Sequence, residues 1–127
     1  MTKILVVEDS EGILFALRRF FEKKGMEVVN SPTVADALER CSRTEFDLIM
    51  LDFNLGKGDK GWSVAPRVRK EPDRLGTPKI IGMSATVGLG NPERMGFKSA
   101  DFDLFVKKPF DLQELGQQVD ELLGLDD

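Results

Sequence analysis

Four strand-like runs of this sequence end in polar side chains that are suited to holding a phosphoryl group and a divalent cation. The most informative of these is Asp52, a carboxylate that directly follows the apolar run 48–51. Such a run is typical of a strand buried on both faces of a parallel sheet, and ligands bind at the carboxyl edge of such sheets. The runs over residues 4–7, 79–83 and 104–107 end in Glu8 and Asp9, in Ser84 and in Lys108. The sequence therefore predicts that these side chains meet at one edge of a sheet.

Three of these side chains, Glu8, Asp9 and Asp52, are carboxylates. If the first and third strands are neighbours, the three carboxylates lie close together, and like charges so close are costly unless a cation neutralises them. An all-oxygen site of this kind suits Mg²⁺. Each residue alone has a simpler interpretation, because an acidic pair favours a helix N-terminus, Ser84 can cap a turn and Lys108 can be a solvated lysine. Only the set as a whole favours a metal and phosphoryl site.

The elements that must position these residues alternate between strand and helix. Strands are predicted over residues 3–7, 27–30, 47–52, 79–84 and 103–107. Helices are predicted from the cap Ser10 to the stop Gly25, after the cap Thr33 over residues 34–41, over 63–70, over 92–98, and from the cap Asp111 to residue 123. Five strands that alternate with helices require right-handed crossovers, which give a parallel sheet with helices on both faces. The predicted fold is a doubly wound, three-layer α/β domain.

Two glycine-rich segments interrupt this pattern. Residues 53–61 contain three glycines and several charges, which predicts a mobile, exposed loop beside Asp52. Residues 85–100 contain three further glycines and Pro92. Because these residues oppose helix formation, we expect a long loop there that holds only the short helix 92–98.

Length and composition describe a globular protein. The 127 residues suffice to bury a core but leave little room for a second domain, so we assign residues 1–127 to one domain. Apolar residues make up 41% of the chain, and no apolar run approaches the ~20 residues of a membrane helix. The chain enters a strand at once, without a recognisable signal or transit peptide, which predicts a cytoplasmic protein. A net charge of −4 argues against direct nucleic-acid binding.

The cysteine and histidine content narrows the chemistry further. A single cysteine, Cys41, excludes an intramolecular disulfide, and its amphipathic helical surroundings predict a small core residue. The chain contains no histidine, which excludes histidine-based triads and histidine-ligated metals. It follows that a phosphohistidine donor, if one is used, belongs to a partner.

The polar residues at the strand ends resemble those of the receiver domain of two-component response regulators. They are two acids after the first strand, an aspartate after the third, a hydroxyl after the fourth and a lysine before proline after the fifth. The resemblance covers residues 2–125 and implies a flavodoxin-like sheet with strand order 2-1-3-4-5. It implies that Asp52 is the phosphoacceptor and that Mg²⁺ is the cofactor. The implied metal ligands are Glu8, Asp9, Asp52 and the backbone carbonyl of Asn54.

The resemblance also implies roles for residues near the ends of the last two strands. Lys108 matches the family's lysine better than Lys107 does, because that lysine directly precedes a proline. Ser84 is the implied switch hydroxyl, and the small Ala85 leaves space for the phosphoryl group. Phe105 is the implied switch aromatic. We expect Ser84 and Phe105 to be exposed before phosphorylation and to turn inward after it.

The resemblance implies a signalling module with protein partners, and not an enzyme that acts on other substrates. The phosphoryl group would come from a histidine kinase or a histidine phosphotransfer protein, and the chain would catalyse only its own phosphorylation and dephosphorylation. A downstream protein target would bind the surface made by residues 92–98, the fifth strand and the last helix. We expect no direct nucleic-acid or membrane partner. Because only residues 124–127 follow the last helix, we expect a stand-alone receiver or a receiver cut from a longer regulator.

Two departures from the family pattern and two rival functions bear on this interpretation. The family commonly has proline where Gly56 stands, and the loop is about one residue longer, so the docking of a kinase there is altered. The glycines after Thr86 are also unusual.

A pseudo-receiver, which is never phosphorylated, is one rival function, but such proteins generally lack one or more of the site residues found here. An aspartate-nucleophile phosphatase would need a second aspartate where Asn54 stands.

Overall fold

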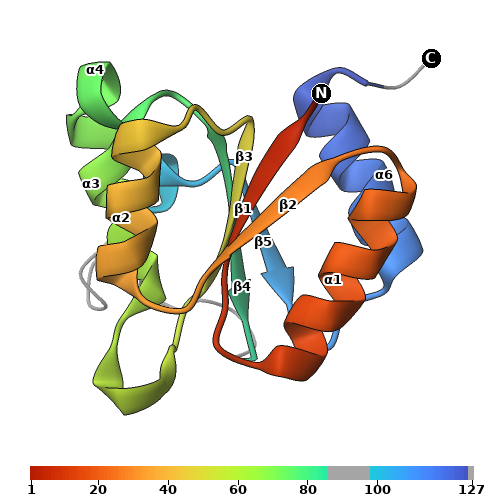
Figure 1. Ribbon diagram of the computed structural model, residues 1–127. Coiled ribbons are helices and arrows are strands. Elements are labelled where there is room, and N and C mark those ends of the chain that lie inside the picture. The colour runs from red at the N-terminus through yellow and green to blue at the C-terminus, as the bar shows by residue number, and fades with distance from the viewer. Residues whose placement is uncertain (86–97, 126–127) are drawn as a thin grey trace.

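The computed structural model of the protein describes residues 1–85 and 98–125, which form one sheet between two layers of helices (Figure 1). The strands are β1 (Lys3–Val7), β2 (Glu27–Ser31), β3 (Leu48–Asp52), β4 (Lys79–Ser84) and β5 (Leu104–Lys107). They lie in the order β2-β1-β3-β4-β5, and all four neighbouring pairs are parallel. The predicted doubly wound fold and the strand order 2-1-3-4-5 are therefore confirmed.

Helices cover both faces of the sheet, as predicted (Figure 1). One face carries α1 (Glu11–Lys23) and α6 (Leu112–Leu123), and the other carries α2 (Val34–Arg43), α3 (Val64–Lys70) and the short α4 (Pro72–Leu75). Three 3₁₀ turns, η1 (Gly56–Gly58), η2 (Gly61–Ser63) and η3 (Ser99–Asp101), lie in the connections. The sheet thus separates two apolar cores.

Strand β3 supplies side chains to both cores, and its alternation sets the direction of the residues that follow it. Leu51 packs in the core beneath α2 and α3, whereas Met50 packs in the core beneath α1 and α6. Because alternate residues of a strand point to opposite faces, Asp52 emerges on the side of Met50. Phe53 joins the core on the other side. The pattern of the strand therefore delivers the Asp52 carboxylate to the α1 side of the sheet edge.

Side-chain caps define the starts of the three longest helices among the described residues. The side chains of Ser10, Thr33 and Asp111 each accept a hydrogen bond from the backbone N–H three residues later. These bonds satisfy N–H groups that have no partner inside the helix. Gly25 follows the end of α1 with a φ of +85°, a conformation that favours glycine. All four predicted boundary residues are confirmed.

The loop after β3 is exposed only in part: Asn54, Gly56, Gly58 and Lys60 are exposed as predicted, but three other residues are buried. Phe53 is fully buried, Leu55 is 5% exposed, and Gly61 is also buried. The two apolar side chains join the core beneath α2 and α3, which removes their surface from water. A Cβ at Gly61 would clash with the backbone carbonyl oxygen of Asp52. The glycine at this position therefore lets the loop fold closely onto the end of the strand.

Helix α3 confirms the helix predicted over residues 63–70, but other details between β3 and β5 differ from the prediction. Ser63 lies at the N-cap position of α3, but its hydroxyl donates to the Lys60 carbonyl at 2.7 Å instead of capping the helix. The sequence pattern does not predict α4, although proline at its first position is typical of helix starts. The predicted helix 92–98 lies outside the described residues except for Lys98, whose backbone is extended. No helix of the described part of the chain is long and apolar enough to cross a membrane.

Candidate functional site

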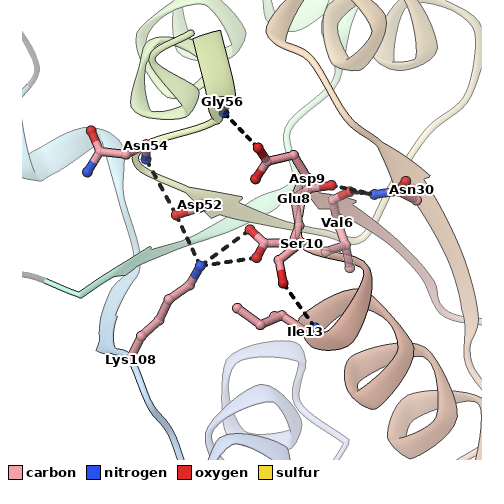
Figure 2. A network of polar contacts seen from close by, with 10 residues as sticks. All are labelled: Val6, Glu8, Asp9, Ser10, Ile13, Asn30, Asp52, Asn54, Gly56 and Lys108. Carbon is pink, nitrogen blue, oxygen red and sulfur yellow. Dashed lines mark hydrogen bonds and ion pairs between the residues drawn. The ribbon is translucent and has the colours of Figure 1, made fainter. Parts of the chain in front are cut away.

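Four of the side chains predicted to meet, those of Glu8, Asp9, Asp52 and Lys108, come together at the carboxyl edge of the sheet (Figure 2). Glu8 follows β1, and the register of β1 against β3 places Val7 beside Leu51, so Glu8 lies next to Asp52. Ser84 ends β4 beside Lys107 of β5, and the Lys108 backbone N–H donates to the Ser84 carbonyl at 2.8 Å. Parallel strands in register therefore account for the convergence.

Lys108 connects the two buried acids. Its Nζ lies 3.1 Å from Oε1 of Glu8 and 3.2 Å from Oδ1 of Asp52. Figure 2 shows Lys108 pointing toward both acids. The Lys108 side chain is 15% exposed, whereas Lys107 is exposed. The alternation at the end of β5 thus turns Lys108, and not Lys107, toward the acids.

Glu8 and Asp52 are both buried, so neighbouring charges act strongly on their carboxyl groups. Glu8 is 1% exposed and Asp52 is 7% exposed. Burial, together with the hydrogen bond and the charge of Asp52, raises the pKa of Glu8 to about 7, although the Lys108 ammonium acts in the opposite direction. One lysine therefore does not fully compensate two buried carboxyl groups, and a further cation would be favourable here.

Asp9, the third acid, lies on the exposed side of the site. Its Oδ2 accepts a hydrogen bond of 2.7 Å from the backbone N–H of Gly56, in the loop after β3. Asn54, whose carbonyl is an expected metal ligand, lies in the same loop, and its backbone N–H is 3.4 Å from Oδ1 of Asp52. The loop after β3 thus contacts two of the three acids.

Asn30 supports the site although the sequence analysis does not single it out. Its side-chain amide donates to the backbone carbonyls of Val6 and Glu8, at 3.0 and 3.1 Å. These bonds fix the backbone at the end of β1, where the two adjacent acids begin. An asparagine at the end of the neighbouring strand is the signal that could have indicated this role.

The donor set fits a hard divalent cation. One carboxylate oxygen from each of Glu8, Asp9 and Asp52 can be chosen so that the three lie within 4.8 Å of one another. The three acids carry more negative charge than Lys108 neutralises, and carboxylate oxygens are the ligands that Mg²⁺ prefers. The acidic cluster is therefore suited to Mg²⁺.

The expected switch residues are less exposed than predicted. Ser84 is 5% exposed and Phe105 is half-buried, whereas Ala85 is exposed. The Phe105 ring lies 4.9 Å from the ring of Phe102 and 6.1 Å from that of Phe53, measured between centroids. Contacts among three aromatic rings stabilise the inward position of Phe105. The expectation that Ser84 and Phe105 point outward is therefore wrong for this structure.

Comparisons with known proteins agree with this fold. A family model described as the response regulator receiver domain matches residues 4–120. The autoinducer 2 sensor kinase/phosphatase LuxQ of Vibrio vulnificus is 35% identical over 121 residues, which are 95% of this chain and 13% of LuxQ. The chain spans about half or less of the length of the curated relatives that it matches.

Solved structures give the same result. The response regulator TrrA of Thermotoga maritima, in complex with Mg²⁺ and BeF, has a TM-score of 0.79 and 30% identity, and the match covers 96% of this chain and 99% of TrrA. A two-component response regulator of Clostridium difficile has the same fold, with a TM-score of 0.83 at 24% identity and coverage of 98% and 97%. The fold and the site define a signalling domain of two-component systems. The chain belongs to the response regulator receiver domain family.

Proposed function

We propose that Asp52 accepts a phosphoryl group from a phosphohistidine of a histidine kinase or a histidine phosphotransfer protein. The observation that carries this proposal is the position of Lys108 Nζ between Glu8 and Asp52, beside a cluster of three carboxylates. Aspartate is a weak nucleophile toward phosphorus, so the reaction depends on positioning and on charge neutralisation. A buried carboxylate with a lysine at 3.2 Å meets both needs.

In the proposed transfer, a carboxylate oxygen of Asp52 forms a bond to phosphorus while the bond from phosphorus to the partner's imidazole nitrogen breaks. The electron pair of that bond stays on the imidazole. Lys108 is placed to hold the negative charge of the phosphoryl oxygens, and Glu8 keeps the ammonium in position. Bound Mg²⁺, held by Glu8, Asp9, Asp52 and the Asn54 carbonyl, would supply further charge neutralisation.

Ser84 and Ala85 are the residues that we propose to respond to the phosphoryl group. Phosphorylation adds about −1.5 to −2 charges and three strong acceptor oxygens, which favours a hydrogen bond from the Ser84 hydroxyl. The small side chain of Ala85 would leave space for the phosphoryl group. Phe105 would then change its packing, and the surface of β5 and α6 would change for a downstream protein. Residues 92–97, which we expect to share in that surface, lie outside the described residues.

The proposed function is tested by phosphorylation with a small donor. Acetyl phosphate and Mg²⁺ should add the mass of one phosphoryl group to the wild type, and the gain should be absent from Asp52→Asn. Asp73→Asn is the matched control because Asp73 is an exposed aspartate of α4. If the wild type gained no mass with acetyl phosphate or with a phosphorylated phosphotransfer protein, the pseudo-receiver would be the better description.

Amide hydrogen exchange with and without beryllofluoride tests the proposed surface. Protection should change in residues 85–105 and in α6. A change confined to residues 53–61 would place the signalling surface elsewhere.

We propose further that residues 1–127 act as one receiver domain in the cytoplasm, with proteins as partners. The match of the receiver family to residues 4–120 supports the first part. Several longer relatives are named as transcriptional regulators, and this chain matches about half of their length. Binding of this chain to nucleic acid is not part of the proposal, and its net charge of −4 is unfavourable for such binding.

A further inference from the structure

The loop after β3 reaches back to the exposed acid that follows β1. The backbone N–H of Gly56 donates to Oδ2 of Asp9 at 2.7 Å, and the two residues are 47 positions apart in the chain. A Cβ at Gly56 would lie 2.8 Å from the same oxygen, which is too close for an unstrained contact. The backbone at position 56 therefore rests directly on the Asp9 carboxylate (Figure 2).

Asp59 fixes the place of this loop. Its carboxylate Oδ2 accepts a hydrogen bond of 2.9 Å from the backbone N–H of Val34, the first residue of α2. Its own backbone closes the loop, because the Leu55 N–H donates to the Asp59 carbonyl at 3.0 Å and the Asp59 N–H donates to the Gly56 carbonyl at 3.3 Å. Asp59 thus ties the Gly56 turn to the start of α2.

We infer that Asp59 is a positioning residue for Mg²⁺, acting through the Gly56 N–H on the Asp9 carboxylate. This inference rests on the proposed function, which makes Asp9 a metal ligand. Asp9 is exposed, so without a partner its carboxylate would be free to change rotamer. Binding a metal would then fix the side chain at an entropic cost. A hydrogen bond to one oxygen holds the carboxylate in place and leaves the other oxygen for the cation. Such outer partners of metal ligands typically change affinity by about 10- to 100-fold.

The test is calorimetric titration with MgCl₂ alone, without any phosphodonor. Asp59→Ala removes the acceptor that ties the loop to α2, and it should weaken Mg²⁺ binding by about 10-fold or more. Asp59→Asn removes the charge but keeps an oxygen that can accept from Val34, so its affinity should stay close to that of the wild type.

Thr33→Ala is the matched control for stability. Thr33 also caps α2, through the bond from the Asp36 N–H to its hydroxyl at 3.1 Å, but it supports no part of the loop that these contacts define. Both alanine variants should lower the melting temperature in EDTA, because each removes a cap of the same helix. Only Asp59→Ala should lose Mg²⁺ affinity.

The possible results separate this inference from the proposed function. Wild-type affinity in Asp59→Ala, or an equal loss in Thr33→Ala, would overturn the positioning role while leaving the metal site intact. An equal loss in Asp59→Asn would overturn it in favour of a simple charge effect. A wild type that binds no Mg²⁺ would contradict the metal site of the proposed function itself, and the inference with it.

Discussion

Glu8 and Asp9 are adjacent in the sequence, yet they lie in opposite surroundings. Glu8 is 1% exposed and contacts the Lys108 ammonium, whereas Asp9 is exposed and accepts a hydrogen bond from the backbone of Gly56. Successive residues at a strand end point to different sides, so one step along the chain exchanges a buried partner for a loop. The site therefore has a buried half and an exposed half.

The two halves are supported by different parts of the fold. Side chains from the ends of regular strands hold the buried half, which contains Glu8, Asp52 and Lys108. Backbone groups of an irregular loop hold the exposed half, which contains Asp9 and Gly56. All three acids would hold the cation. We expect Lys108 of the buried half to control the reaction rate, and the support of Asp9 in the exposed half to adjust the affinity for the cation.

The largest effect should come from removing the Lys108 ammonium of the buried half. Lys108→Ala leaves the Asp52 phosphoryl group without its ammonium partner, and loss of one such group typically costs about 100- to 1000-fold in rate. Rates of phosphorylation by acetyl phosphate, followed by intact mass, give the measurement. Lys107→Ala, which removes the exposed lysine that precedes Lys108 at the end of β5, should react like the wild type. Equal rates in the two variants would contradict the separate role of the buried half.

A smaller effect should follow from pushing the loop away from β3. Gly61→Ala places a methyl group against the Asp52 carbonyl oxygen, which is backbone and cannot turn aside. We expect a loss of about 3 kcal/mol in the free energy of unfolding, the range of severe overpacking. Gly12→Ala is the matched control, because nothing lies within 4 Å of a Cβ there. Urea unfolding should find that variant no less stable than the wild type, and similar losses in both would mean that the loop is not tightly packed.

The smallest of these effects concerns the exposed half. Saturating Mg²⁺ should stabilise the wild type by roughly 1 to 3 kcal/mol, from the linkage of binding to unfolding. Asp9→Ala should lose most of this gain in thermal melts with and without the metal. Glu11→Ala removes the same charge from an exposed acid in the first turn of α1 and should keep it. A gain in Asp9→Ala equal to that of the wild type would remove Asp9 from the metal site.

The buried half could be predicted from the sequence because it depends on local patterns. Apolar runs define β1 and β3, and the first polar residue after each run must lie at the carboxyl edge. The order of parallel strands then brings Glu8 beside Asp52. The choice of Lys108 came from the resemblance to the family, and the position of its ammonium agrees with that choice.

The exposed half and its loop could not be predicted in the same way. Glycines and charges in residues 53–61 suggest exposure, but the burial of Phe53 and Leu55 depends on tertiary contacts beneath α2 and α3. The bond from Gly56 to Asp9 depends on the loop conformation, which no periodicity records. The inward position of Phe105 likewise depends on Phe53 and Phe102, which come from distant parts of the sequence.

The most direct test of the central claim is to locate the phosphoryl group. The wild type is treated with acetyl phosphate and Mg²⁺ and then with borohydride, which reduces an aspartyl phosphate to homoserine. Tandem mass spectrometry of the digested protein should find homoserine at position 52 and at no other aspartate, and none without acetyl phosphate. Homoserine at another position, with Asp52 unchanged, would contradict the assignment of Asp52 as the phosphoacceptor.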